Sequence, residues 1–243
     1  MGAGIIWDFD DTLVETTVFF ETAREKFARY MVSLGFPLDG VLETLNLKDI
    51  ENVRNCGGFM KDCFPSAMAQ TYHHFCKEAG SEPDQAVHRI VEDMGWWVFK
   101  QKPRPVPGAG EVLEELAAGG WRLFMATKGD PSVQWARIEE SGLKSYFEEV
   151  YVLRDKTRRE FEMIARRQDI EPRCSWVVGN SIKSDINPGM RAGFNCIYIP
   201  NQFTWQFEME DPLGDFVTLD SLHMVPGHLI SGKPAMRKAH CPG

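Results

Sequence analysis

The sequence lacks most features that mark secreted, membrane or nucleic-acid-binding proteins. Its six cysteines form no Cys-x-x-Cys pair and do not cluster with histidines at zinc-site spacing, so we expect small core residues in a reducing compartment. No apolar run approaches the ~20 residues that span a bilayer. Acidic residues interrupt the apolar start that a signal peptide would need. The net charge of -8 disfavours nucleic acid and anionic membranes as partners. These absences predict a cytoplasmic protein with neither kind of partner.

Length and composition indicate a substantial core. The chain has 243 residues, of which 43% are hydrophobic and 12% aromatic, which argues against global disorder. This length fits one large domain, or one domain that carries an insertion. The acidic balance does not exclude a small phosphorylated substrate, because local charge can oppose the global sign.

The hydrophobic pattern divides the chain into two kinds of segment. From residue 14 to about residue 100, apolar side chains recur at steps of three and four, which is typical of amphipathic helices. The alternating prolines Pro103, Pro105 and Pro107 then predict a stiff connector. Beyond them, short apolar runs alternate with helical patterns, which indicates βαβ units and a mainly parallel sheet.

We therefore predict an α/β fold with a doubly wound, mainly parallel, Rossmann-like sheet and a helical cap inserted after the first strand. The predicted core comprises residues 1–13 and 105–230, the cap residues 14–104, and a loose tail residues 231–243. The more local expectations are helices over residues 14–34, 38–46 and 184–192, a loop over residues 54–59, and an edge strand over residues 216–219.

An apolar run at residues 5–7 ends in acidic side chains, and the chain is organised around this stretch. Side chains alternate along a strand, so Asp8 and Asp10 share one face while Phe9 points into the core. Two carboxylates on one face repel each other unless a cation neutralises them. Oxygen ligands of this kind suit Mg²⁺. The alternative is a solvated acidic turn, which rarely follows directly on an apolar strand.

Further polar residues are expected at the carboxyl ends of later strands, where ligands bind in open α/β sheets. Thr127 and Lys128 follow one predicted strand, Lys156 follows the next, and Asn180 and Asp185 follow a third. Carboxylates, a hydroxyl, ammonium groups and an amide at one sheet edge can hold a metal ion and a phosphoryl group together.

In order and spacing these segments resemble the four signatures of the haloacid dehalogenase (HAD) superfamily. The matching residues are Asp8-Phe9-Asp10-Asp11-Thr12, then Thr127, then a lysine near a helix start, then Gly179-Asn180-Ser181 with Asp185. The resemblance covers roughly residues 1–13 and 105–200. The helical insertion falls where this superfamily carries its C1 cap, and it resembles the cap of small-molecule phosphatases and phosphosugar mutases; of these we expect a phosphatase-type hydrolase.

The resemblance implies a role for each matched residue. Asp8 would be the nucleophile that forms an aspartyl-phosphate, and Asp10 the general acid and base. Haloacid dehalogenases themselves lack a carboxylate at the position of Asp10, so its presence favours phosphoryl transfer. Thr127 would donate to the phosphoryl oxygens, although a threonine after a strand is by itself more often a helix cap. Asp8, the Asp10 carbonyl, Asp185 and Asn180 would hold Mg²⁺.

Two of these positions depart from the usual pattern. Asn180 stands where an aspartate is most common, which removes one negative charge from the metal site. The usual Lys-Pro pair is here Lys156-Thr157, and the resemblance implies that Lys156 would be the catalytic lysine. Lys128, which directly follows Thr127 and could bind substrate in the same space, is its rival.

The loop that contains Gly57, Gly58 and Phe59 is the candidate for a cap segment that contacts the substrate; an ordinary helix–helix turn is the alternative. The sequence thus predicts a Mg²⁺-dependent phosphatase that acts on a small phosphorylated metabolite. A phosphosugar mutase would use the same four motifs, and a non-catalytic binding module on this fold is the third reading.

Overall fold

The chain forms two compact units in a computed structural model that describes residues 2–231. Among the described residues, the core unit comprises residues 2–15, Pro103–Lys128 and residues 135–231, and the cap unit comprises Thr16–Lys102 with Gly129–Gln134. Apart from residue 231, the tail predicted for residues 231–243 lies outside the described residues. Each unit has its own buried hydrophobic cluster, as independently packed units must.

The core unit is built on a six-stranded sheet in the order β5-β4-β1-β6-β7-β8, and every neighbouring pair is parallel. Its strands are β1 (Gly4–Trp7), β4 (Arg122–Lys128), β5 (Glu149–Leu153), β6 (Trp176–Gly179), β7 (Asn195–Tyr198) and β8 (Val217–Thr218). The strand predicted over residues 216–219 is therefore present as the edge strand β8. The predicted Rossmann-like α/β class is confirmed.

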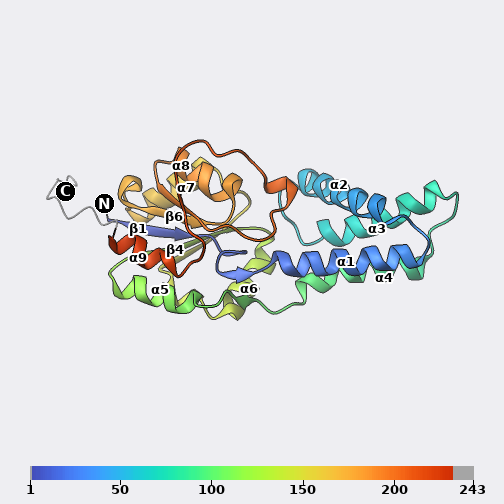
Figure 1. The fold of residues 1–243 in the computed structure, drawn as a ribbon, viewed down its shortest axis with the longest axis horizontal. Helices are drawn as coiled ribbons and strands as arrows, with labels where there is room; N and C mark the ends of the chain where they lie inside the picture. Colours follow the sequence, from blue (N-terminus) through green and yellow to red (C-terminus); the bar gives the residue numbers. More distant parts are fainter. Residues whose placement is uncertain (1, 232–243) are drawn as a thin grey trace. The chain divides into compact units, whose positions relative to one another are not determined.

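Helices cover both faces of this sheet (Figure 1). The helices are α5 (Ala109–Ala118), α6 (Pro131–Ser141), α7 (Arg158–Gln168), α8 (Asn187–Arg191) and α9 (Met224–Ser231). Apolar residues of α5, α6 and α9 belong to the cluster on one face, and apolar residues of α7 to the cluster on the other. Burial on both faces explains why the strands are continuous apolar runs rather than alternating ones.

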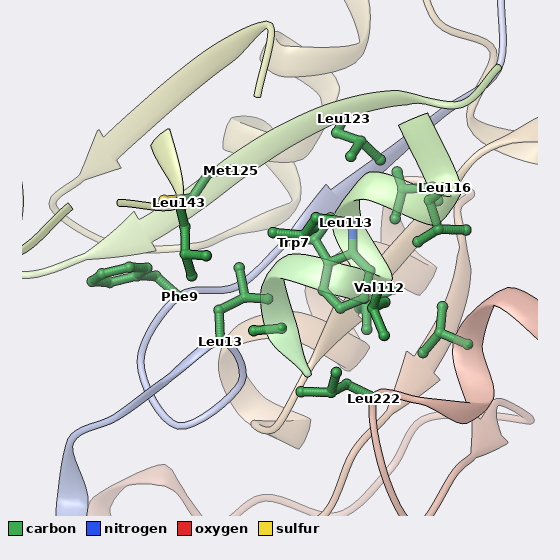
Figure 2. Close-up of a cluster of buried hydrophobic side chains, with 14 of the residues drawn as sticks. Trp7, Phe9, Leu13, Val112, Leu113, Leu116, Leu123, Met125, Leu143 and Leu222 are labelled. Carbon is green, nitrogen blue, oxygen red and sulfur yellow. The ribbon is translucent and has the colours of Figure 1, made fainter. Parts of the chain in front are cut away.

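Alternation along the central strand divides the core between the two faces. Ile5 and Trp7 pack into the cluster that contains α5, whereas Ile6 packs into the cluster that contains α7. Figure 2 shows Trp7 beside Val112 and Leu113 of α5. Because these strand side chains are fully buried, the register of β1 is fixed up to its carboxyl end, where the polar residues begin.

The cap unit contains α1 (Thr17–Ser33), α2 (Leu38–Cys56), α3 (Cys63–Glu78) and α4 (Gln85–Phe99). Two sequence expectations about residues 14–56 are wrong. Val14 and Glu15 do not begin a helix but form β2 (Val14–Glu15), which pairs with β3 (Arg104–Pro105) in an antiparallel ladder. The second helix does not end near residue 46 but continues to Cys56, and Gly57 ends it in the left-handed conformation.

The core unit also departs from expectation after β6. The helix predicted over residues 184–192 is replaced by a π-helical turn at Ile182–Ile186 followed by α8. The cysteine expectation is correct only in part: Cys63, Cys76 and Cys196 are buried, whereas Cys56 and Cys174 are exposed, and Cys241 lies outside the described residues. None of the helices that the structure describes is long and apolar enough to cross a membrane.

Gly95 allows α3 and α4 to pack closely, and Gly95→Ala is expected to destabilise the protein. A Cβ atom there would lie 2.5 Å from Pro65 Cα and 2.9 Å from Pro65 N, which are rigid backbone atoms. We expect the free energy of unfolding to fall by about 1–3 kcal/mol, as for other overpacked sites, in urea titrations. Gly227→Ala in α9 is the control, because nothing lies within 4 Å of its Cβ position. Helix propensity alone would make both substitutions stabilising, so a more stable Gly95→Ala protein would contradict the packing argument.

Candidate active site

The predicted site residues of the core unit lie at the carboxyl ends of four neighbouring strands, β5, β4, β1 and β6. Asp8 directly follows β1, Thr127 and Lys128 end β4, Lys156 follows β5, and Asn180 and Asp185 follow β6. Parallel strands bring these side chains to one edge of the sheet, which is where open α/β sheets bind ligands.

Asp8 is buried, and the side chains of Lys156 and Thr12 hold its carboxylate. Its Oδ1 contacts Nζ of Lys156 in a short ion pair, and its Oδ2 accepts a hydrogen bond from Oγ1 of Thr12 at 2.8 Å. Burial, with the negative charge of Asp185, raises the pKa of Asp8 to about 7, although Lys156 opposes the shift. A carboxylate in this position favours the approach of a further cation.

The carboxylate of Asp185 lies directly against Gly179, where there is no room for a side chain. A Cβ atom on Gly179 would lie 2.3 Å from Oδ2 of Asp185, so a larger residue there would displace the carboxylate. The same Oδ2 accepts from the backbone N–H of Ser181 at 3.0 Å, and Oδ1 contacts Nζ of Lys156 at 2.6 Å. The π-helical turn thus carries Asp185 back toward the end of β6.

Lys156 links the two buried carboxylates. Burial opposes its positive charge, but Asp185 and Asp8 outweigh that effect and raise the pKa of Lys156. The next residue, Thr157, begins α7 with a capping box in which its side chain and that of Glu160 bond reciprocally. The helix start that fixes Lys156 therefore needs no proline after the lysine.

Lys128 has different partners from Lys156. Its Nζ contacts Oγ of Ser184 and lies 2.8 Å from Oε1 of Glu208. Of the two rivals, Lys156 is the one whose ammonium contacts Asp8. The geometry places Lys156 at the predicted nucleophile Asp8, and Lys128 at the edge of the site.

The donor set at this edge fits Mg²⁺. Asp8, Asp185 and Lys156 together carry a net charge of minus one when ionised, and all three are buried. Among the described residues no group of three or more Asp, Glu, His or Cys side chains is placed to hold a metal, so the carbonyl oxygen of Asp10 would have to join the two carboxylates. Hard oxygen donors with few protein ligands and room for water are what Mg²⁺ prefers.

Asn180 lies at the point where these oxygen atoms converge. In the amide orientation that satisfies its neighbours, its nitrogen lies 3.0 Å from Oδ2 of Asp8, 3.2 Å from Oγ1 of Thr12 and 3.2 Å from the carbonyl oxygen of Asp10. The side chain therefore holds the prospective ligands together through its nitrogen. To ligate the metal through its oxygen, as the sequence predicts, the amide would have to turn.

Asp10 is held by two residues of the core unit. Its Oδ1 forms a short ion pair with Nη1 of Arg137 on α6, and its Oδ2 accepts a hydrogen bond from Oγ1 of Thr127 at 3.2 Å. The guanidinium of Arg137 also lies over the ring of Phe9, 5.5 Å from its centroid. Thr127, the predicted phosphoryl ligand, is thus within reach of the predicted general acid.

Sequence reasoning missed Arg137, Thr12 and Glu208. The position of Arg137 offered one signal, because it directly precedes the fully buried Ile138 on α6 and so lies beside the buried stripe of that helix. Thr12 was part of the first motif, but no role was assigned to it. Glu208 gave no signal, since it lies in a loop 80 residues from its partner Lys128.

The remaining predicted substrate-binding residues belong to the cap unit. Gly57 and Gly58 have φ angles of 65° and 152°, and with Phe59 they form the connection between α2 and α3. In the same unit Asp130 accepts hydrogen bonds from the backbone N–H groups of Ser132 at 2.9 Å and of Val133 at 3.4 Å, and so caps α6. A substrate contact by residues 57–59 stays a prediction.

Comparison with known proteins gives three findings. Residues 5–199 match the profile of the family described as haloacid dehalogenase-like hydrolase. The glyceraldehyde 3-phosphate phosphatase of Pyrococcus abyssi is 27% identical to this chain. The alignment covers 80% of this chain and 79% of the length of that phosphatase. Among solved structures, a haloacid dehalogenase-like hydrolase from Xanthomonas campestris has a TM-score of 0.77 at 20% identity, covering 95% of this chain and 91% of its own. The magnesium-bound HAD-hydrolase YfnB of Bacillus subtilis has a TM-score of 0.62 at 18% identity. The match covers 94% of this chain and 98% of the YfnB chain.

Proposed function

The chain belongs to the haloacid dehalogenase-like hydrolases, and from this premise we propose that it is a Mg²⁺-dependent phosphatase that hydrolyses a small phosphomonoester through an aspartyl-phosphate at Asp8. The observation that carries the proposal is the buried cluster in which Nζ of Lys156 contacts both Asp8 and Asp185. Such a cluster presents a nucleophilic carboxylate, a cation for the phosphoryl oxygens and oxygen donors for a metal at one point.

In the first half of the proposed reaction, a carboxylate oxygen of Asp8 attacks phosphorus and the ester oxygen leaves. Nζ of Lys156 and Oγ1 of Thr127 would bind the phosphoryl oxygens and stabilise the charge that spreads over them. Asp10 would give its proton to the departing alkoxide. To do so it has to leave at least one of its present contacts, with Arg137 or with Thr127.

In the second half, Asp10 would take a proton from water, which attacks phosphorus and regenerates the carboxylate of Asp8. Bound through Asp8, Asp185 and the Asp10 carbonyl, Mg²⁺ would supply charge shielding and a template for the phosphoryl group. Arg137 would return Asp10 to one orientation after each proton transfer, because the ion pair and the Phe9 ring fix its guanidinium.

The substrate proposed first is a three-carbon phosphomonoester of the glyceraldehyde 3-phosphate type. Support comes from archaeal relatives with the name glyceraldehyde 3-phosphate phosphatase, which are 24–27% identical over about four-fifths of this chain. These relatives also align over most of their own length.

Removal of Mg²⁺ is expected to abolish phosphate release. The purified protein is assayed with glyceraldehyde 3-phosphate and a panel of phosphomonoesters, with Mg²⁺ or with a chelator in excess. We expect a loss of at least about 100-fold with the chelator, since the metal offsets charge on both the nucleophile and the phosphoryl group. Addition of Mg²⁺ in excess of the chelator should restore the rate.

Product analysis separates the alternatives. Free phosphate in equimolar amount with the alcohol supports the phosphatase. An isomerised sugar phosphate without free phosphate would instead identify a mutase, and the absence of any turnover across the panel would point to a binding module.

A further inference from the structure

Glu208 ends a short 3₁₀ turn, Gln206–Glu208, in the loop after β7, and three hydrogen-bonding contacts hold its carboxylate at the edge of the site. Its Oε1 lies 2.8 Å from Nζ of Lys128, and its Oε2 accepts from Oγ of Ser181 at 3.0 Å and from Oγ of Ser184. The ammonium of Lys128 also contacts Oγ of Ser184, so the network is closed. Both charged side chains are largely buried, with exposed fractions of 14% for Lys128 and 15% for Glu208.

The network keeps the carboxylate of Glu208 ionised. Burial alone would raise the pKa of Glu208, but Lys128 and the serine hydroxyls outweigh it and hold that pKa below its usual range. Glu208 is therefore anionic at neutral pH, and it offsets the charge of Lys128. A partly buried ion pair of this kind is screened by solvent less than a surface pair.

Lys128 is close to the place where the phosphoryl group is proposed to bind. It directly follows Thr127, the predicted phosphoryl ligand, at the end of β4. Its other partner, Ser184, directly precedes Asp185. The cations Lys156 and Arg137 already contact Asp8, Asp185 and Asp10. A second anionic group on the substrate near this edge would therefore meet Lys128 first, and Glu208 with it.

We propose that Glu208 is a specificity-determining residue that neutralises Lys128 and thereby selects phosphomonoesters with an uncharged alcohol portion over those with a carboxylate or a second phosphate. The inference rests on the proposed phosphatase function and narrows its substrate class. A second anionic group would have to compete with Glu208 for the ammonium and would lie beside the carboxylate of Glu208, so repulsion rejects it.

The test compares two substrates that differ at one carbon. In glycerol 3-phosphate this carbon is a hydroxymethyl group, and in 3-phosphoglycerate it is a carboxylate. We expect the wild-type enzyme to prefer glycerol 3-phosphate by about tenfold or more in kcat/KM. Glu208→Gln should reduce this preference by about tenfold, mainly through a lower KM for 3-phosphoglycerate, because it uncovers the charge of Lys128 at nearly constant shape.

Three further variants show whether the effect acts through Lys128. In Glu208→Gln combined with Lys128→Met the gain toward 3-phosphoglycerate should disappear, and Glu208→Asp should restore the wild-type preference. Glu210→Gln is the matched control, because this neighbouring acid of the same loop contacts Asn187 at 2.8 Å instead of Lys128. Its preference should equal that of the wild type.

A wild-type enzyme that hydrolyses both substrates equally well would overturn the inference and leave the proposed phosphatase function intact. If the wild-type protein releases phosphate from neither substrate and from no other member of the panel, the proposed phosphatase function itself is wrong. An unchanged preference in an active Glu208→Gln enzyme would also overturn the inference. If Glu208→Gln does not fold, Lys128→Met is measured instead. Its preference for glycerol 3-phosphate over 3-phosphoglycerate should equal or exceed that of the wild type. A smaller preference than that of the wild type would reject the role of Glu208.

Discussion

Asp8→Asn is expected to lower kcat for phosphate release by at least about 10³-fold, the scale seen when a covalent nucleophile is removed. The amide has nearly the shape of the carboxylate but cannot form the phosphoryl ester. Wild-type protein quenched during turnover should carry phosphate that hydroxylamine removes, and the variant should carry none. If the variant keeps most of the activity, the covalent route through Asp8 is wrong.

The same substitution should leave the fold intact. The pKa of Asp8 is raised to about 7 by burial and by Asp185, so between its ordinary value and pH 7 the native state binds more protons than the unfolded state, and stability falls as pH rises. Asparagine is uncharged and does not lose this stability at high pH, so the urea midpoint of Asp8→Asn at pH 8 should match or exceed that of the wild type.

Asp11→Asn is the matched control for the loss of activity. Asp11 has a left-handed φ of 61° that asparagine accepts, so this variant should fold and retain activity.

Lys156→Met is expected to impair both stability and catalysis. The methionine leaves Asp8 and Asp185 buried together without the ammonium that both now contact. Loss of one partner from a buried charge cluster costs about 3–5 kcal/mol, which urea titration at pH 8 should detect. We also expect kcat to fall by about 10²–10³-fold, because a charge that stabilises the phosphoryl group in the transition state is lost.

The pH dependence of this loss has a definite sign. Without Lys156 the pKa of Asp8 rises further, because the lysine that opposes its upward shift is gone, so the native variant takes up a proton that the unfolded chain binds only at lower pH. The stability deficit against the wild type should therefore shrink from pH 8 to pH 5. Lys128→Met is the comparison, since its ammonium contacts Glu208 and Ser184 instead. A larger loss of kcat in Lys128→Met than in Lys156→Met would reverse the assignment of the two lysines.

The sequence was sufficient to predict the sheet and the strand ends that bear the site. Strand ends are predictable because apolar runs buried on both faces leave few alternatives, and Asp8 and Asn180 follow such runs directly. Which lysine meets Asp8 was left open, because both follow strand ends. Only the β5–β4–β1–β6 order and the Thr157 capping box place the ammonium of Lys156 between the carboxylates.

Features that depend on distant pairing or on local backbone geometry could not be predicted. The helical pattern continues without a break into Val14 and Glu15, but pairing with residues 104–105 makes them a strand. The π-helical turn before α8 has no periodic signature, and it sets the position of Asp185. The contact of Glu208 with Lys128 depends on the path of a loop without regular pattern.

The position of β1 in the sheet has a consequence for biosynthesis. This central strand is made before the cap, whereas both of its partners, β4 and β6, are made after it. The ribosome therefore exposes an apolar segment, Gly4–Trp7, that must wait for more than a hundred further residues before its backbone can pair. The cap helices α1 to α4 are contiguous and bury their own cluster, so they can fold during that interval. A ribosome that stalls after residue 100 and before β4 has emerged would thus leave a folded cap and an unpaired, aggregation-prone strand on the same chain.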